Sequence, residues 1–390
     1  MLIGISGPIL VSEFTEFIED SSRHEEAIPT GLGGTAVNLI AKGLLARGYK
    51  LVIFTLDTSV NEEVILDGPQ LRICVGPFRS RARYQAMDMF CAERSYLAQA
   101  ALREKPDIIH AHWTYEFALG ALDSGIPTLI TVRDWAPTIL RFYKNAYRSL
   151  RYLMDWWTFR RAQNLSANSY YIQKLILGRF GINVPVIPNP IDDSFLLTNE
   201  KNFNSDSSTI VSINNGMSEH KNVKNLIIGF NYIRQRMPCS RLKLIGDEFG
   251  PNQQAEQWSK NSGLDDGIDF LGSLQRQDVK RALEESDVLI HPSLEESFGN
   301  TLIEAMGLRL PVIGGMNSGA VPWILDEGNA GILCDVKRPE KIAQAAIGLL
   351  TSQDQWRKYS ESGYERVVAQ FSIEKVVDAC LKQYQLILSA

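Results

Sequence analysis

Apolar, strand-like runs alternate with amphipathic helical segments along this chain, and the alternation occurs twice. The first set of predicted strands comprises residues 2–5, 51–55, 107–109, 127–132 and 184–187. The second set comprises residues 209–213, 242–245, 269–271, 288–290 and 311–313. Repeated alternation of this kind predicts parallel sheets with helices on both faces. We therefore expect an α/β protein with two doubly wound, Rossmann-like domains facing a cleft, where ligands bind beyond the carboxyl ends of the strands.

A polar stretch separates the two sets of strands. Residues Glu200 to Ser208 have the composition of a linker, and the 390 residues of the chain are enough for two separate cores. The predicted organisation is a first domain at 1–195, a linker at 196–208, a second domain at 209–370 and a C-terminal helix at 371–390.

Composition excludes several classes of protein. A net charge of −5 argues against bulk binding to nucleic acid. The five cysteines are scattered, without the close pairs of a zinc site, and indicate reduced thiols. The first residues lack the basic region of a signal peptide, and no apolar run is long enough to span a bilayer. These features predict a cytoplasmic protein.

The most informative motif lies between His291 and Met306. Two carboxylates, Glu296 and Glu304, stand eight positions apart around Gly299, between a predicted strand and a predicted helix. A glycine at such a junction lets backbone N–H groups approach a phosphate, and the helix start adds partial positive charge. A phosphate-binding site between two carboxylates that can bind hydroxyl groups suits a sugar nucleotide. The alternative is an exposed, capped helix start, because glutamate is common in a first turn.

This segment resembles the Glu-x7-Glu signature of retaining glycosyltransferases with the GT-B fold, most closely glycosyltransferase family 4. The resemblance covers most of the chain and is strongest from Ser212 to Asp335. It implies that Glu304 binds the ribose of the donor and that Glu296 faces the donor sugar. It also implies a C-terminal helix that crosses back to the first domain. The donor-binding residues assigned in this way are Phe298, Gly299, Asn300, Thr301, Glu304 and Gly246.

Lys221 follows the first strand of the second set, and its ammonium group is suited to neutralise a leaving diphosphate. Members of the family place an arginine near this lysine, but the corresponding positions here are Gly216 and His220. The hypothesis therefore requires that His220 is protonated or that another cation replaces the arginine. We assign Lys221, Glu296 and His112 to catalysis, with Glu296 positioning the sugar and not acting as a nucleophile. A solvated loop lysine is the alternative.

Three segments of the first domain carry further candidates. Gly33 and Gly34 precede the first long helix. The family has a loop at this position that borders donor and acceptor. The sequence lacks the Gly-x-Gly-x-x-Gly spacing of a nicotinamide-binding site. Strand alternation places His110 and His112 on one side, so we expect a buried His110 and a His112 that reaches the cleft. Arg133 and Asp134 are acceptor-side candidates, and the alternative is that they pair with each other or with a neighbour.

The segment from Arg141 to Arg161 is both basic and aromatic. It is expected either to contact anionic lipid at the inner face of the membrane or to pack internally with a basic outer face. The first possibility suits a lipid-linked acceptor.

The predicted function is retaining transfer of a sugar, of the hexosyltransferase type, from a nucleoside-diphosphate sugar to a hydroxyl of a saccharide or lipid-linked acceptor in polysaccharide or glycolipid assembly. No cofactor, metal or nucleic-acid partner is expected. The alternatives are a degenerate, non-catalytic sugar-nucleotide binder, favoured by the missing arginine, and a GT-B sugar-nucleotide epimerase.

Overall fold

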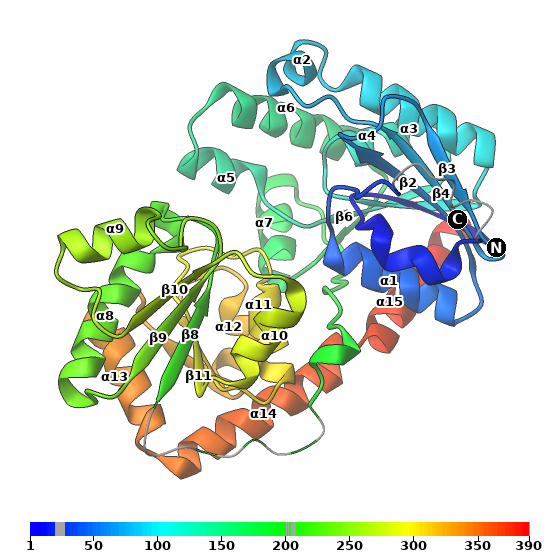
Figure 1. The fold of residues 1–390 in the computed structure, drawn as a ribbon. Coiled ribbons are helices and arrows are strands. Elements are labelled where there is room, and N and C mark those ends of the chain that lie inside the picture. The colour runs from blue at the N-terminus through cyan, green and yellow to red at the C-terminus, as the bar shows by residue number, and fades with distance from the viewer. Residues whose placement is uncertain (20–27, 198, 200, 202, 204–207, 390) are drawn as a thin grey trace. The chain divides into compact units, whose positions relative to one another are not determined.

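The computed structural model describes residues 1–19, 28–197, 199, 201, 203 and 208–389. The chain forms two compact units, Met1–Pro190 with Ile373–Ala390, and Ile191–Ser372. Each unit contains one sheet with helices on both of its faces (Figure 1), which confirms the predicted α/β class of two Rossmann-like domains. The predicted linker at 196–208 lies partly outside the described residues, as does the last residue of the predicted C-terminal segment.

The first unit has a seven-stranded sheet with the order β3-β4-β2-β1-β5-β6-β7. Its strands are β1 (Leu2–Ser6), β2 (Lys50–Asp57), β3 (Val64–Asp67), β4 (Leu71–Pro77), β5 (Ile108–His112), β6 (Thr128–Val132) and β7 (Asn164–Ala167). Only β3 pairs antiparallel to its neighbour. The prediction missed β3, β4 and β7. The strand predicted at 184–187 is wrong, since this segment makes a single bridge from Val186 to Ala167 and Pro185 has no N–H group to extend a ladder.

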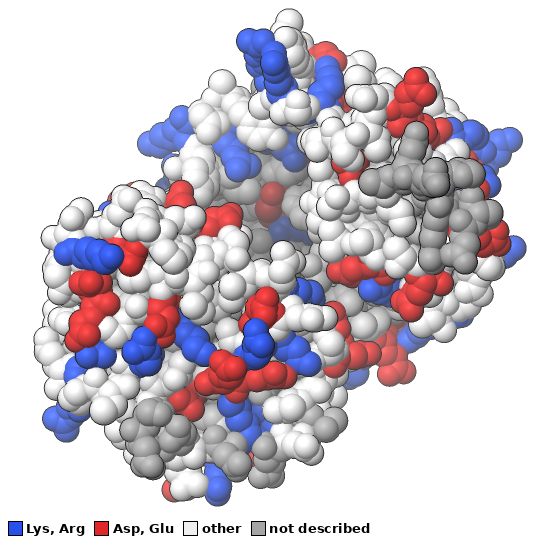
Figure 2. All heavy atoms as spheres, viewed as in Figure 1, with Lys and Arg blue, Asp and Glu red and all other residues white. Residues whose placement is uncertain are grey.

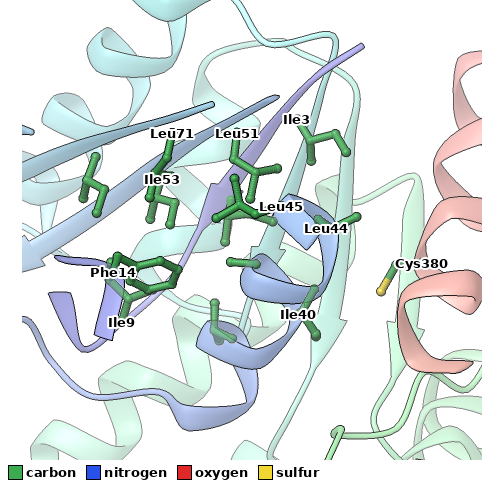
Figure 3. Packing of buried hydrophobic residues seen from close by; sticks show 14 of the residues in the cluster. Ile3, Ile9, Phe14, Ile40, Leu44, Leu45, Leu51, Ile53, Leu71 and Cys380 are labelled. Atoms are coloured by element: carbon green, nitrogen blue, oxygen red, sulfur yellow. The ribbon is translucent and has the colours of Figure 1, made fainter. Parts of the chain in front are cut away.

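Apolar side chains of this sheet alternate between its two faces. Ile3, Ile5, Leu51 and Ile53 pack with α1 on one face, whereas Val52 and Phe54 pack on the other. Figure 3 shows α1 lying between the first of these faces and the segment that carries Cys380. The helices of this unit are η1 (Val11–Phe17), α1 (Thr35–Ala46), α2 (Ala82–Met87), α3 (Cys91–Glu104), α4 (Glu116–Asp123), α5 (Ala136–Phe142), α6 (Ala146–Arg161), α7 (Tyr170–Phe180) and α15 (Ile373–Leu388).

The C-terminal helix α15 belongs to the core of the first unit. A Cβ at Gly43 of α1 would lie 2.5 Å from Ile373 and 2.7 Å from Val377, so the glycine allows the two helices to approach closely. Tyr384 is fully buried, and its hydroxyl lies 2.7 Å from Nδ1 of His110 on β5. The first sheet therefore depends on side chains from both ends of the sequence.

The basic segment 141–161 comprises the end of α5, the connecting residues 143–145 and the whole of α6. The Asn145 side chain accepts a hydrogen bond from the N–H of Arg148 and caps α6. Met154 and Phe159 of α6 are buried, whereas Leu153 and Trp156 are 52% and 43% exposed. The helix therefore packs through one face and presents a mixed apolar and basic surface on the other.

The second unit has a wholly parallel sheet with the order β10-β9-β8-β11-β12-β13. Its strands are β8 (Thr209–Ile213), β9 (Arg241–Ile245), β10 (Ile268–Gly272), β11 (Val288–His291), β12 (Val312–Gly315) and β13 (Ile332–Cys334), of which β13 was not predicted. Its helices are η3 (Asp193–Phe195), η4 (Glu219–Lys221), α8 (Val223–Arg236), α9 (Gln254–Asn261), α10 (Arg276–Glu284), α11 (Asn300–Gly307), α12 (Val321–Ile324), η5 (Asp326–Gly328), α13 (Pro339–Leu350) and α14 (Gln353–Phe371).

Successive residues of β8 and β11 point into different apolar clusters, as expected for a sheet covered on both faces. Ile210 and Ile290 pack with α8 and α13, whereas Val211 and Leu289 pack with α10, α11 and α14.

No helix in the described parts of the chain is both long and apolar enough to cross a membrane.

Candidate functional site

The strand order of the second unit defines where a ligand should bind. The chain starts in the middle of the sheet at β8, winds outward to β10, and then returns to β11 on the other side of β8. Ligands of doubly wound sheets bind beyond the carboxyl ends of the strands at such a reversal. The segments that follow β8 and β11 carry Lys221 and Glu296, and Gly246 directly follows β9.

Lys221 and Glu296 form an ion pair at this edge. Nζ of Lys221 lies 2.9 Å from Oε1 of Glu296, and Nε2 of His291 lies 3.2 Å from the same oxygen. Burial raises the pKa of Glu296, but the hydrogen bond from His291 and the charge of Lys221 outweigh burial, and the pKa is lowered. Glu296 is therefore an ionised carboxylate at neutral pH. His291, the last residue of β11, was not predicted as a site residue.

The surroundings of His220 do not favour its protonation as a replacement for the missing arginine. Burial and the adjacent charge of Lys221 lower the pKa of His220 below its usual range, so the imidazole is neutral at neutral pH. Its backbone oxygen instead accepts a 2.7 Å hydrogen bond from the N–H of Leu294. This bond joins the loop after β8 to the loop after β11 and so holds Lys221 beside Glu296.

The predicted phosphate-binding site lies at the start of α11. Gly299 precedes the helix with φ of 104°, a conformation that favours glycine, and Asn300 is the first helical residue. Phe298 is 2% exposed and packs edge-to-face against Trp323 and Phe371. The predicted donor contact of Phe298 concerns its backbone amide, so it stays a prediction although the ring belongs to the core. Only its backbone is available to a ligand beside Gly299, Asn300 and Thr301.

Glu304 lies in the second turn of α11 and contacts a residue that the sequence did not indicate. Its Oε1 lies 3.2 Å from Nη1 of Arg276, whose Nη2 lies 3.2 Å from Oδ2 of Asp192. The guanidinium also lies 4.7 Å from the ring centre of Phe195. Burial raises the pKa of Glu304, although Arg276 opposes this. Arg276 begins α10 just beyond the end of β10, and position at a strand end is the only signal that could have identified it.

The glycine-rich loop of the first unit is fixed by a buried carboxylate. The N–H of Gly31 donates to Asp57 at the end of β2, and Asp57 also accepts from the N–H of Ser59. A Cβ at Gly34 would lie 2.1 Å from the backbone oxygen of Pro8, whereas a Cβ at Gly33 would meet nothing within 4 Å. Gly34 is therefore required by the backbone, and Gly33 faces open space.

His110 and His112 lie on one side of β5, as alternation predicts, with ring centres 4.2 Å apart. His110 is buried between the hydroxyls of Tyr384 and Thr131. His112 was expected to reach the cleft, but its side chain is fully buried, and its Nδ1 accepts a hydrogen bond from Nε of Arg133. Burial lowers the pKa of His112 well below its usual range, so the ring is neutral.

Arg133 and Asp134 do not pair with each other. Arg133 contacts His112 and Asn189, whereas the carboxylate of Asp134 accepts a hydrogen bond of 3.1 Å from the hydroxyl of Tyr115. Burial raises the pKa of Asp134 to about 6. In the described ranges, no group of three His, Cys, Asp or Glu residues is arranged to hold a metal ion.

Comparison with known proteins places this architecture among the glycosyltransferases. The family described as "Glycosyltransferase Family 4" matches residues 33–195, and "Glycosyl transferases group 1" matches residues 195–366. The two matches adjoin and follow the two Rossmann-like domains of a GT-B glycosyltransferase. The chain belongs to glycosyltransferase family 4, and it is a sugar-nucleotide glycosyltransferase.

Relatives and solved structures agree with this placement. N-acetyl-alpha-D-glucosaminyl L-malate synthase of Bacillus anthracis is 27% identical over 78% of this chain and 80% of its own length. The sucrose-phosphate synthase structure from Thermosynechococcus elongatus is 16% identical and superposes with a TM-score of 0.76, covering 100% of this chain and 99% of that one. Anabaena HepE in complex with UDP and glucose is 16% identical and has a TM-score of 0.69 over 99% of this chain and 100% of that one.

Proposed function

We propose that the protein transfers a sugar from a nucleoside-diphosphate sugar to a hydroxyl acceptor with retention at the anomeric carbon. The observation that carries the proposal is the partly buried Lys221–Glu296 pair, which lies beside the loop leading into α11 at the strand reversal of the second unit. The names of two matched proteins support the donor class, since HepE was crystallised with UDP and glucose and the Bacillus relative is by name an N-acetyl-alpha-D-glucosaminyl L-malate synthase.

In this proposal, the backbone N–H groups from Gly299 to Thr301 and the ammonium of Lys221 hold the diphosphate. Glu304, oriented by Arg276, binds the ribose hydroxyls. Departure of the nucleoside diphosphate builds negative charge, which Lys221 stabilises. Metal-independent transfer follows from this division of roles, because the ammonium and the helix N-terminus supply the positive charge.

Glu296 positions the donor sugar in this proposal and does not attack it. Lys221 and His291 both contact its Oε1, which fixes the orientation of the carboxylate. We propose that the acceptor attacks from the face that the diphosphate leaves, with the leaving phosphate accepting the acceptor proton. Consumption of donor only when an acceptor is supplied would separate this reaction from non-catalytic binding, and product analysis would separate it from epimerisation.

The donor site is tested by thermal unfolding with UDP, GDP, ADP and dTDP sugars, each with and without EDTA, on wild type and Glu304→Ala. One nucleotide is expected to raise the unfolding midpoint of the wild type, because it binds only the folded state. Glu304→Ala is expected to need about 10- to 100-fold more of the same ligand, since a hydrogen-bonded charged partner contributes about 1.5–3 kcal/mol. EDTA is expected to change neither result.

Glu327→Ala is the control for Glu304→Ala, because Glu327 lies on the short helix η5, apart from the strand reversal, in the same unit. It is expected to respond to the nucleotide as the wild type does. No stabilisation of the wild type by any of the four nucleotides would contradict the donor-site assignment.

We further propose that the outer surface of α6 contacts an anionic membrane and brings a lipid-linked acceptor to the first unit, in polysaccharide or glycolipid assembly. Leu153, Trp156 and Arg160 follow the outer stripe of the helix at spacings of three and four. Figure 2 shows Lys and Arg side chains along the part of the first unit that carries α2, α5 and α6. Exposed apolar side chains with basic neighbours favour the surface of anionic lipid.

Sedimentation with phosphatidylcholine vesicles, with and without phosphatidylserine, tests this contact. Wild type is expected to bind only the anionic vesicles. The double variant Leu153→Ser with Trp156→Ser is expected to bind about 100-fold more weakly, because each of the two apolar side chains contributes about 1.5 kcal/mol when buried. Leu102→Ser is the matched control, since Leu102 on α3 is also 52% exposed. Equal binding by the variants and wild type would contradict the proposal.

A further inference from the structure

Arg133 is a buried cation that lacks an acidic partner. It directly follows β6 and is 6% exposed, and burial lowers its pKa to about 10, so it remains charged at neutral pH. Within the described parts of the chain it forms no ion pair, and the carboxylate of the neighbouring Asp134 accepts a hydrogen bond from Tyr115. Leaving a charge buried and uncompensated costs several kcal/mol. Such a group is expected where an anion completes the site.

The donors of Arg133 are only partly used. Nε and Nη2 lie 3.1 and 3.0 Å from Nδ1 of His112, and Nη1 donates to Oδ1 of Asn189. A guanidinium has five N–H bonds. These contacts therefore leave one N–H on Nη1 and one on Nη2 without a partner among the described residues.

His112 adds a third unused donor. Arginine can only donate hydrogen bonds, so Nδ1 of His112 must be the unprotonated acceptor, and the neutral ring carries its proton on Nε2. Nε2 is buried and has no hydrogen-bond partner in the part of the chain that the structure describes. Buried polar groups are nearly always paired, which makes this N–H a candidate for contact with a ligand.

The backbone beside this pair is also unusual. Trp113, the residue after β5, has φ of 63°, which is rare for a bulky side chain, and the Arg133 guanidinium lies 5.8 Å from its ring centre. Strained backbone concentrates at functional sites. The strain lies at the carboxyl end of β5, next to the reversal between β1 and β5 in the sheet order.

We propose that Arg133 and His112 bind a carboxylate or phosphate group of the acceptor. The proposal rests on the proposed glycosyl transfer and names the chemical class of its acceptor, a hydroxyl compound that also carries an oxyanion. Spare N–H bonds on two guanidinium nitrogens match the two oxygens of a carboxylate or phosphate, and the Nε2–H of His112 supplies a further donor. Burial strengthens these hydrogen bonds, because water does not compete for the donors.

Thermal unfolding in sodium phosphate, sodium succinate or sodium chloride of equal ionic strength tests the site without turnover. Phosphate or succinate is expected to raise the midpoint of wild type above that in chloride, and whichever ion does so identifies the oxyanion. Arg133→Met is expected to abolish this difference, and Arg133→Lys to retain part of it, because lysine keeps the charge but loses the planar fork. Equal midpoints of wild type in all three salts would overturn the proposal.

Transfer assays with acceptors that differ only in an anionic group, such as inositol and inositol phosphate, provide the second test. The KM of wild type is expected to be about 10- to 100-fold lower for the anionic acceptor than for the neutral one, because a hydrogen bond to a charged group has an effect of this size. In Arg133→Met the two KM values are expected to be equal. A wild type that shows no preference would overturn the proposal. Donor-induced stabilisation, measured in parallel, should be the same in both proteins. Its absence in wild type would instead contradict the donor site of the proposed function.

Discussion

Replacing Lys221 with methionine is expected to lower kcat for glycosyl transfer by about 10²- to 10³-fold, which is the usual effect of removing one group that stabilises developing negative charge. The structure makes this effect large because His220, the neighbouring position where a second cation was expected, is neutral. Lys221 is then the cation next to Glu296 in the loop after β8. Steady-state kinetics with saturating donor and acceptor would measure the change.

Lys224→Met is the matched control for Lys221→Met. Lys224 is exposed three positions along the chain, with its ammonium 5.5 Å from the ring centre of Trp258, and kcat should remain within about twofold of wild type because an exposed charge contributes little. Lys221→Met also leaves His291 as the remaining hydrogen-bond partner of the Glu296 carboxylate among the described side chains. Circular dichroism melts are therefore needed to show that the variant is folded under assay conditions. A folded Lys221→Met protein with wild-type kcat would remove Lys221 from the mechanism.

Gly246→Ala is expected to lower the midpoint of thermal unfolding of the second unit by about 10 °C or more. Gly246 has φ of 132°, and a Cβ there would lie 1.6 Å from the backbone oxygen of Asn214. The strained conformation costs roughly 1–3 kcal/mol. The overlap with the backbone adds to this, because neither strand end can move away without breaking the hydrogen bonds between β8 and β9. A domain of this size loses about 2–4 °C per kcal/mol.

Gly263→Ala is the control for Gly246→Ala. Gly263 also has positive φ, at 65°, but a Cβ there would meet nothing within 4 Å. The expected loss is about 1–2 kcal/mol, the cost of the left-handed conformation alone. Differential scanning calorimetry of both variants separates backbone conformation from steric overlap. Equal losses would show that the loops at Asn214 and Gly246 rearrange freely.

The strands of the second unit were predicted more accurately than those of the first, for a physical reason. Strands of a parallel sheet that is covered on both faces are continuous apolar runs, and residues 209–213 and 288–290 show this pattern clearly. The missed strands β3 and β4 lie at the edge of the first sheet, where Arg72 and Asp67 interrupt the apolar pattern. Pro185 has the opposite effect, because it interrupts pairing within a segment whose other residues favour strand.

The candidate site shows a similar division. Spacing along one segment was enough to select Glu296, Glu304 and Gly299. It could not identify Arg276 or His291, because their contacts join segments that are distant along the chain or come from a strand that was expected to be only core. The sequence also could not predict that Phe298 and His112 are buried, because their burial depends on Trp323 and Arg133 from other elements. Assignment of roles to these side chains remains a prediction.

The division of the first unit between residues 1–190 and 373–390 has a consequence for biosynthesis. A ribosome releases Tyr384 and the apolar face of α15 only after the whole second unit has been made. Until then, α1 lacks its partner at Gly43, and the hydroxyl that His110 requires is absent. The second unit, by contrast, is continuous in sequence and can complete its core while the chain is still being made. The half of the protein that is synthesised first is thus the half that finishes folding last.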